Sequence, residues 1–362
     1  MAGAIGLDIG TSGVRAAEVS SGKGRATLER LAEVPLPPGA VRDGEVVDVA
    51  AVAAALRELW ATGRFSTKKV ALGVANSRVV VRQVELPWMP LADLKASLAF
   101  QAQDLVPMPI DQALLDFHPL EEFEAPTGAR LLRGLLVAAS REMVDKLVDA
   151  VQQAKLVPTS VDLTSFAVLR SIGSVVIAGP AADGPGVPVE AIVDVGACVT
   201  NVLVHQGGVP RFVRILPMGG QHLTEAVADR LGVPFERAEQ LKQELGAGAP
   251  DGPAPEWDGS ESDHARRALA DATSALVAEI RGSFDYYVAS SGTAPIAHLL
   301  LSGGSARLAG LDARLSEATR LPVRTVTPLP RLRIGRTGLS EHALGLLAPS
   351  STVPVGLALG AA

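Results

Sequence analysis

The chain has 362 residues, 48% of them hydrophobic and 20% charged, with a formal net charge of -6 at pH 7. A chain of this length predicts two domains, and its acidic balance argues against general binding to nucleic acid or to anionic membranes. The single cysteine, Cys198, excludes an internal disulfide framework, and no uncharged run approaches the roughly 20 apolar residues of a membrane-spanning helix. We therefore expect a cytosolic protein in which Cys198 is a small buried residue rather than a nucleophile. The basic stretch Arg331, Arg333 and Arg336 is typical of a solvated surface.

The first part of the chain alternates strands with one helix, which is typical of α/β domains. Val52, Leu56 and Leu59 recur at helical spacing and predict a helix over 49–60. Runs of apolar and β-branched residues predict strands over 4–9, 14–20, 26–34, 70–75 and 79–86.

Prolines interrupt the chain after these strands. Leucines at helical spacing, beginning at Leu91, predict a helix that ends at Val106, because the next residue is a proline. A strand over 131–140 follows, and then a helix whose buried face runs from Met143 to Val151.

Two loops over 178–188 and 246–259 are rich in glycine and proline. The first comes directly before a second strand that ends in an aspartate. We therefore place the domain boundary in this loop.

Two segments share one pattern, AIGLDIGTSGVR from residue 4 and EAIVDVGACVTN from residue 190. In each, an apolar strand reaches an aspartate, turns at a glycine and returns through small residues to a second strand. Because glycine tolerates unusual backbone conformations, such a turn can bend around a phosphate with its N–H groups pointing inward. The aspartates, Asp8 and Asp194, would hold a hydrated Mg²⁺ that neutralises the phosphates. A plain β-turn explains either copy alone, but duplication after a domain boundary favours one nucleotide gripped from both sides.

Further glycine turns follow. Gly303, Gly304 and Ser305 come between an apolar strand and a predicted helix, where the backbone can lie against a flat ligand such as adenine. An ordinary strand-to-helix turn is the alternative. A second diglycine opens a predicted helix over 217–232. Glu239 and Lys242 lie three residues apart on one helical face, where a surface ion pair is the alternative to a ligand contact.

These motifs carry a family resemblance. DIGTSGVR, DVGACVTN, LLLSGGSARLAGL and AEQLK resemble the two phosphate motifs, the adenosine motif and the adenosine-side helix of the actin, Hsp70 and sugar-kinase ATPase superfamily. Within it, the stretch ELPWMPLADLKASLAFQAQDLVPMPIDQALLDFHPL is similar to the PilM family, the cytoplasmic actin-like proteins of type IV pilus assembly, which are related to the divisome protein FtsA. The resemblance runs nearly from end to end.

The resemblance implies an α/β protein of the actin-like ATPase fold, in which two ribonuclease H-like domains hold ATP and Mg²⁺ between them. It also implies an inserted subdomain 1C, which replaces the usual subdomain 1B at a different place. The implied boundaries are 1–78 for the first part of domain 1A, 79–157 for subdomain 1C, 158–188 for the rest of domain 1A, 189–330 for domain 2 (2A and 2B) and 331–362 for a C-terminal return to domain 1.

The resemblance also implies a nucleotide site, with Asp8 and Asp194 as the ligands of Mg²⁺. The first phosphate turn would consist of Asp8, Gly10, Thr11, Ser12 and Arg15, and the second of Asp194, Gly196, Cys198 and Thr200. The ribose and adenine would meet Gly219, Gly220, Glu239, Lys242, Gly303, Gly304 and Ser305.

Two departures from the superfamily bear on hydrolysis. Relatives that hydrolyse ATP often have lysine at the position of Arg15, and an acidic or polar residue on the helix joining the domains, where it orients the attacking water. Asp162 is the local counterpart of that residue and our candidate catalytic group, although Asp162 or Thr164 would equally serve as a helix cap. We therefore expect weak or no ATPase activity, with the nucleotide fixing the angle between the domains.

Three functions from different classes fit these observations. The resemblance implies a cytoplasmic ATP-binding scaffold, peripheral to the inner face of the cytoplasmic membrane through its partner. It would bind the N-terminal peptide of a PilN-like membrane protein in a cleft between the first domain and the strand over 79–86 of subdomain 1C. It would couple this partner to the pilus motor or platform. The second function is an FtsA-like, self-associating filament former, although the C-terminal VPVGLALGAA lacks the basic residues of a membrane-binding helix. The third function is that of a small-molecule kinase. Such an enzyme needs a catalytic aspartate beside a substrate pocket, and the sequence offers no obvious one.

Overall fold

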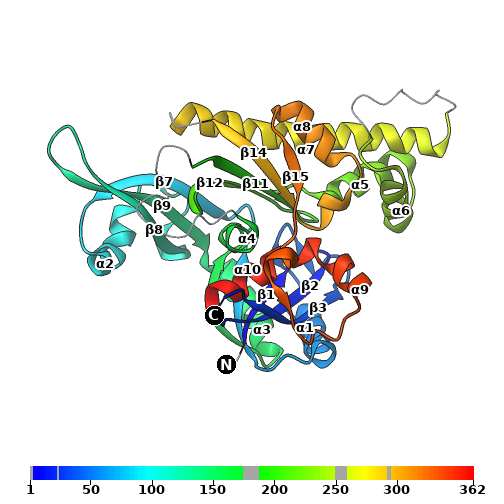
Figure 1. The fold of residues 1–362 in the computed structure, drawn as a ribbon, viewed down its shortest axis with the longest axis horizontal. Helices are drawn as coiled ribbons and strands as arrows, with labels where there is room; N and C mark the ends of the chain where they lie inside the picture. The colour runs from blue at the N-terminus through cyan, green and yellow to red at the C-terminus, as the bar shows by residue number, and fades with distance from the viewer. Residues whose placement is uncertain (1–2, 23, 174–186, 249–258, 292–294) are drawn as a thin grey trace.

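The computed structural model describes residues 3–22, 24–173, 187–248, 259–291 and 295–362. Two large β-sheets lie one above the other in Figure 1, with helices between and outside them. The first sheet has the order β10 (Val157–Leu163), β6 (Lys69–Val74), β1 (Ala4–Ile9), β2 (Gly13–Ser20), β3 (Thr27–Pro35) and β16 (Arg333–Ile334). The second has the order β13 (Val209–Leu216), β12 (Thr200–Gln206), β11 (Val189–Val195), β14 (Ile296–Ser302) and β15 (Val323–Thr325).

The two sheets repeat one topology. In each, three consecutive antiparallel strands are followed by two strands that run parallel to the first of the three. β1 therefore corresponds to β11, and β2 corresponds to β12. The duplication confirms the prediction of two α/β domains, and it places the two strands that end in an aspartate at the centres of their sheets.

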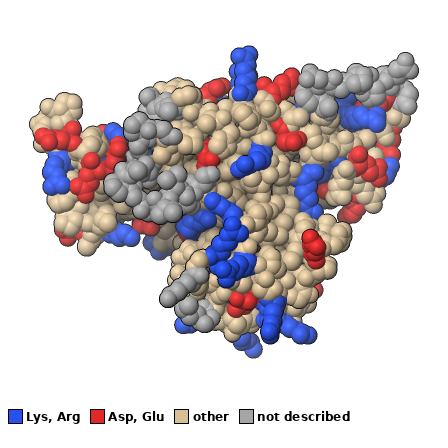
Figure 2. All heavy atoms as spheres, viewed as in Figure 1, with Lys and Arg blue, Asp and Glu red and all other residues tan. Residues whose placement is uncertain are grey.

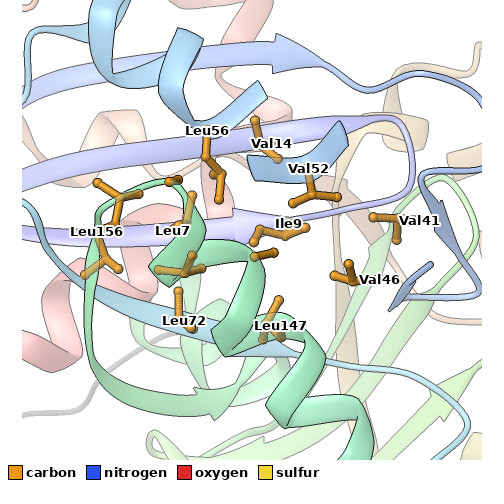
Figure 3. Packing of buried hydrophobic residues seen from close by; sticks show 14 of the residues in the cluster. Leu7, Ile9, Val14, Val41, Val46, Val52, Leu56, Leu72, Leu147 and Leu156 are labelled. Atoms are coloured by element: carbon orange, nitrogen blue, oxygen red, sulfur yellow. The ribbon is translucent and has the colours of Figure 1, made fainter. Parts of the chain in front are cut away.

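Helices cover the outer face of each sheet. In the first domain, α1 (Val49–Gly63) and α3 (Arg141–Gln153) pack against each other, and Figure 3 shows Leu7, Leu56 and Leu147 meeting in this core. The packing of α3 here ties the end of the predicted 79–157 subdomain to the first core. In the second domain, the cover consists of α5 (Gly220–Leu231), α6 (Phe235–Leu245), α7 (Glu261–Ser291) and α8 (Leu311–Thr319).

Two helices lie between the sheets, α4 (Thr164–Ile172) and α10 (Thr352–Ala361). Their backbones are in direct contact where they cross, as shown by Gly356, where an added Cβ would overlap the Ala167 carbonyl. A Cβ on Gly6 of β1 would likewise overlap the Pro354 carbonyl of α10. Only glycine permits so close an approach at these positions. The crossed pair therefore forms a tightly packed layer below the inter-domain region.

A third, smaller sheet projects from the first domain, at the left of Figure 1. Its order is β7 (Val79–Pro87), β9 (Arg130–Ser140) and β8 (Ala113–Glu124), and α2 (Leu91–Gln101) covers one face. β7 starts in the first core, where Val79 is buried, but further along it lies beside β13 of the second sheet. The expectation that this strand borders the first domain therefore holds only for its beginning.

The helix predicted to reach Val106 ends earlier, at Gln101. The Leu105 N–H closes a turn onto the Ala102 carbonyl at 2.9 Å, and the Arg82 guanidinium donates to the Leu105 carbonyl at 3.1 Å. Leucine spacing alone does not reveal these competing bonds. The other predicted strands and helices form within a few residues of the predicted ranges, except after the diglycine at 303–304.

After that diglycine the chain forms only a short 3-10 turn, Gly304–Arg307, and α8 starts at Leu311. Gly310 precedes α8 with a positive φ of 86°, which ends the turn and lets the chain change direction. The predicted helix N-terminus is therefore not directly beside the diglycine.

The predicted loops over 178–188 and 246–259 lie largely outside the described residues, as does the domain boundary placed in the first of them. Within the part of the chain that the structure describes, no single helix is long and apolar enough to cross a membrane. The pair Glu341–Leu347 and Pro349–Ala361 reaches that length and composition only when taken together, with a bend of 58°. Most of α10 is buried against β1 and α4.

On the face shown in Figure 2, basic side chains gather where the two domains meet. The Arg331 guanidinium donates to the carbonyls of Ser171 and Gly173 at the end of α4. This arginine of the basic stretch therefore holds two segments together and is only partly the solvated surface that we expected.

Candidate functional site

The hairpin around each aspartate closes in the same way. The Gly10 N–H donates to the Gly13 carbonyl at 3.0 Å, and the Gly196 N–H donates to the Val199 carbonyl at 2.9 Å. Each turn therefore joins two antiparallel strands through four residues, once on each sheet. The two copies of the sequence motif thus form the same type of turn.

Both turns face one cleft of about 1230 Å³ between the domains. A cleft of this size has ample room for a nucleotide, since pockets for ligands of that class span about 300–1,000 Å³. The predicted site residues that line it are Asp8, Gly10, Thr11, Ser12, Arg15, Asp194, Gly196, Cys198, Gly220, Glu239, Lys242, Gly303, Gly304 and Ser305.

Thr200 and Gly219 support the cleft from behind rather than lining it. The buried Thr200 hydroxyl donates to the Met218 carbonyl at 2.7 Å. A Cβ on Gly219 would collide with the carbonyls of Gly196 and Ala197, so this glycine lets α5 approach the second turn. Both residues hold the turn at Gly196 in place.

Asp8 and Asp194 form the acidic centre of the cleft. Burial raises the pKa of Asp194 from 3.8 to about 7, and the neighbouring Asp8 carboxylate adds to the rise. Burial also raises the pKa of Asp8, against the charge of Arg15. The Oδ1 atom of Asp194 is buried and has no hydrogen-bond partner in the described structure. A bound cation would give the Asp194 Oδ1 atom a partner and would reduce the repulsion between the two carboxylates.

Arg15 is bound within its own domain. Its guanidinium contacts Glu33 at 2.7 Å and the Ser12 hydroxyl at 2.9 Å, and it lies 3.8 Å from Asp8. Arg15 lies directly opposite Asp8 in the pairing of β1 with β2. Its closest ion pair is thus with Glu33, and its charge acts on the Asp8 carboxylate from a greater distance.

Glu239 and Lys242 form an ion pair at 2.7 Å that lines the cleft, so the alternative of a merely solvated surface pair does not describe it. The Lys242 side chain is only 12% exposed, and its ammonium also donates to the Gly220 carbonyl at 3.0 Å and the Thr224 hydroxyl at 2.9 Å. These bonds join α6 to the first turn of α5. The ion pair and the second diglycine thus belong to one wall of the cleft.

The glycine turns of the second domain converge on the Gly196 carbonyl. It accepts from the Gly220 N–H at 2.9 Å and from the Ser305 hydroxyl at 2.8 Å. Gly303 adopts a positive φ of 95°, and a Cβ there would overlap the Val195 carbonyl. The three motifs predicted to surround one nucleotide therefore meet at one point.

Cys198 lies where the two glycine turns approach each other across the cleft. Burial raises the pKa of its thiol, and the Thr11 hydroxyl and the Asp43 backbone lie within hydrogen-bonding reach of it. Asp43 belongs to the tip of a small hairpin of the first domain, formed by β4 (Val41–Arg42) and β5 (Glu45–Val46). Cys198 is thus buried, as predicted, and its thiol is held in the protonated form.

Asp162 does not line the cleft. Its carboxylate accepts from the Leu163 N–H at 2.7 Å and forms an ion pair with Arg170 of α4. Among the residues that the structure describes, no side-chain hydrogen bond caps α4, so Asp162 is not its cap either. The next residue but one, Thr164, lines the cleft, because the chain changes from strand to helix between them. This position gives no support to a catalytic role for Asp162.

Asn201 and Thr164 are cleft residues that the sequence did not reveal as such. Asn201 closes the DVGACVTN motif and lies directly opposite Asp194, where Arg15 lies opposite Asp8 in the first motif. Residues opposite each other on antiparallel strands share one face of the sheet. A comparison of the two motif copies would therefore have pointed to Asn201.

Comparison with known proteins decides the family. The family model for the type IV pilus assembly protein PilM matches residues 6–362. The chain belongs to the PilM family. This PilM-family chain is also similar to a chain in the solved PilM-PilN type IV pilus biogenesis complex, with 27% identity and a TM-score of 0.83, over 99% of this chain and 98% of that chain.

More distant similarities agree with the fold. The cell division protein FtsA of Bacillus subtilis is 24% identical over 268 residues, which cover 67% of this chain and 58% of FtsA. The match thus spans less than two thirds of that protein. The structure of MreB5 of Spiroplasma citri bound to ADP has a TM-score of 0.52 at 12% identity, covering 91% of this chain and 92% of MreB5. The predicted actin-like ATPase fold is confirmed.

Proposed function

We propose that this PilM-family protein binds ATP or ADP with Mg²⁺ in the cleft and serves as a cytoplasmic scaffold in type IV pilus assembly or a related secretion system. One observation carries the nucleotide part of this proposal. Asp8 and Asp194 end the central strands of two matching hairpins that face one cleft, and the Asp194 Oδ1 atom is buried without a partner in the described structure.

The residues of the cleft fit Mg²⁺. This ion usually keeps several waters and takes only one or two protein carboxylates, together with phosphate oxygens. Asp8 and Asp194 would hold the ion, which when bound neutralises phosphate charge. The wall built by Glu239, Lys242 and Gly220 would contact the nucleoside.

We expect slow hydrolysis or none. Arg15 is bound to Glu33 and Ser12, and Asp162 lies outside the cleft in an ion pair with Arg170. Neither is free to orient an attacking water. Turnover should therefore lie far below the typical enzymatic kcat of about 10 per second. The nucleotide would then act by fixing the arrangement of the two domains.

The proposed partner is the N-terminal peptide of a PilN-like membrane protein, by analogy with the similar chain from the PilM-PilN complex. An extended peptide can bind by adding a strand to an exposed sheet edge. β10 is such an edge strand of the first sheet, and Val157 and Val161 are 51% and 39% exposed. Its edge offers backbone groups for pairing and apolar side chains for recognition.

The small sheet reaches the same region through β8. The His118 ring of β8 lies 5.3 Å from the Phe166 ring of α4, centroid to centroid, and α4 directly follows β10. This region lies between the first domain and the small sheet, where we expect the peptide, although β7 itself contacts β13 of the second sheet. We therefore place the peptide at the β10 edge, next to β8, and propose that the protein reaches the membrane and the pilus motor through this partner.

The test is a binding titration with a synthetic peptide of about ten residues from the N-terminus of the cognate PilN-like protein. Val161→Lys should abolish 1:1 binding, because it places a charge on the β10 edge. Val288→Lys is the matched control, since Val288 is also exposed (51%) but lies on α7 of the second domain. Deletion of 79–157 would be a poor test, because it removes α3 from the first core. Equal binding by both variants would show that the peptide binds elsewhere.

An FtsA-like filament is the second candidate, supported by the similarity to FtsA. The C-terminal helix α10 is largely buried, with Val355 and Leu357 at 0% and 1% exposure, so it is engaged in packing between the sheets. Sedimentation of the protein with Mg²⁺ and ATP distinguishes the two candidates. Pelleting that depends on nucleotide would favour the filament.

A further inference from the structure

Asn201 connects the two domains at the floor of the cleft. It lies in β12 of the second sheet and is 5% exposed. Its Oδ1 atom accepts hydrogen bonds from the Thr164 hydroxyl at 3.0 Å and the Ser165 hydroxyl at 2.9 Å, both in the first turn of α4. Two hydroxyl donors fix which end of the amide is the oxygen, so the NH₂ group is directed to the other side.

Asp194 lies on that other side. It is directly opposite Asn201 in the pairing of β11 with β12, and the Asn201 amide stabilises the ionised Asp194 carboxylate. Ser302 flanks Asp194 from β14 and also favours its ionised form. The Ser302 hydroxyl shares a buried hydrogen bond of 2.7 Å with the Thr352 hydroxyl of α10. Asp194 thus lies between two polar side chains, each of which reaches a helix packed on the first domain.

The corresponding position in the first domain has no such connection. Arg15 takes the place of Asn201 opposite Asp8, but its partners Ser12 and Glu33 belong to its own domain. Only the second copy of the motif therefore crosses the domain boundary through the residue opposite its aspartate.

We infer that Asn201 and Ser302 are positioning residues that transmit the occupancy of the cleft at Asp194 to α4 and α10, and through α4 to the β10 edge. The inference rests on the proposed nucleotide binding. α4 begins at Thr164, directly after β10 ends at Leu163, and it crosses α10 in backbone contact at Gly356. A displacement of the first turn of α4 therefore moves the end of β10 with it.

Asp194 is the shared contact of this network, since Asn201 and Ser302 both lie opposite it on the neighbouring strands. A ligand that repositions the Asp194 side chain therefore changes its contacts with both of them. Either Ser302 or Thr352 can be the donor in their shared bond, so Ser302 is able to donate to Asp194 while it accepts from Thr352.

Two serines of α4 provide a matched test. Ser165 and Ser171 are both buried, at 1% and 2% exposure, and neither lines the cleft. The Ser165 hydroxyl donates to Asn201 across the domain boundary, whereas the Ser171 hydroxyl donates to the Val168 carbonyl of its own helix at 2.9 Å. Ser165→Ala removes one inter-domain bond, and Ser171→Ala removes a buried hydroxyl without touching the connection.

The experiment compares amide hydrogen exchange over residues 157–169, with and without saturating Mg²⁺ and ADP, in the full chain and both variants. ADP affinity is measured by calorimetry on the same samples. Nucleotide should slow exchange in this segment in the wild type and in Ser171→Ala. In Ser165→Ala that slowing should shrink by about two- to ten-fold, as the loss of one hydrogen bond implies. ADP should still bind, because Ser165 does not line the cleft.

Equal slowing in the two serine variants would overturn the inference and leave the proposed nucleotide binding intact, as would binding of ADP to the wild type without any slowing. If the wild type does not bind ADP in the calorimeter, both the inference and the proposed nucleotide binding are wrong. This outcome can be read from the calorimetry alone, without the exchange data. Ser302→Ala is a second variant, which removes the bond to Thr352 of α10. In this variant the nucleotide should slow amide exchange in α10 less than it does in the wild type.

Discussion

Replacing Asp194 by asparagine should stabilise the nucleotide-free protein above neutral pH. Asp194 is 6% exposed, and burial, together with Asp8, raises its pKa from 3.8 to about 7. Between pH 3.8 and about pH 7, Asp194 keeps its proton in the folded protein but has lost it in the unfolded chain. Stability must therefore fall as the pH rises from about 4 to about 7. The asparagine side chain of the variant has no proton to lose and escapes this penalty.

The size of the effect follows from the interval between the two pKa values, 3.8 in the unfolded chain and about 7 in the folded protein. Each pH unit of that interval is worth about 1.4 kcal/mol, so the full penalty is on the order of 4 kcal/mol. This is a large part of the roughly 5–15 kcal/mol by which a domain is stable. On our proposal, a bound cation offsets this destabilisation in the wild type.

The assay is urea unfolding of the wild type and Asp194→Asn in EDTA, at pH 5 and at pH 8. Using the difference between the two proteins cancels other titrating groups that they share. The variant should gain about 2–3 kcal/mol over the wild type between pH 5 and pH 8, because only the part of the interval from pH 5 to about 7 is crossed. Asp229→Asn, at an exposed position of α5, is the control and should follow the wild type. A pH-independent difference between Asp194→Asn and wild type would refute the buried-carboxylate argument.

The remaining predictions concern the cation, hydrolysis and the helix crossing. Asp8→Ala should weaken ADP binding more in Mg²⁺ than in EDTA, as measured by calorimetry, because its proposed role is to hold the ion. Asp162→Ala should leave any release of phosphate from ATP unchanged, since Asp162 lies outside the cleft. Gly356→Ala should lower the free energy of unfolding by at least about 1–3 kcal/mol, because its Cβ would overlap the Ala167 carbonyl. Gly282→Ala, in open space on α7, should raise it by up to about 1 kcal/mol.

Each of these expectations has a contrary outcome. Equal weakening of Asp8→Ala in Mg²⁺ and EDTA would show that Asp8 does not act through the ion. Loss of phosphate release in Asp162→Ala would restore its catalytic role. Equal effects of the two glycine substitutions would contradict the close crossing of α4 and α10.

The features that the sequence predicted are those set by neighbouring residues. The hairpin closed by Gly10 and its copy closed by Gly196 depend on four consecutive residues, so the pattern alone was enough. The Glu239–Lys242 pair depends only on helical spacing. The duplication of the motif favoured one shared cleft, and the resemblance to the PilM family then supplied how the remaining pieces surround it, which spacing within single segments cannot give.

The features that escaped prediction depend on contacts between distant segments. Asp162 and Thr164 are two residues apart, yet only Thr164 lines the cleft, because the chain turns from strand to helix between them. The bond from Thr164 to Asn201 joins residues 37 positions apart in the chain. The position of β7 beside β13 likewise depends on how the small sheet is placed, which the alternation of side chains along a strand does not determine.

Calorimetric titration of ADP into the wild-type protein, with and without Mg²⁺, tests the central claim most directly. The account predicts 1:1 binding that requires Mg²⁺, that weakens as the pH falls below about 7, where Asp194 gains a proton, and that Asp194→Ala abolishes. Absence of binding to the wild type at pH 8 with Mg²⁺ present would contradict the assignment of the two hairpins as a nucleotide site.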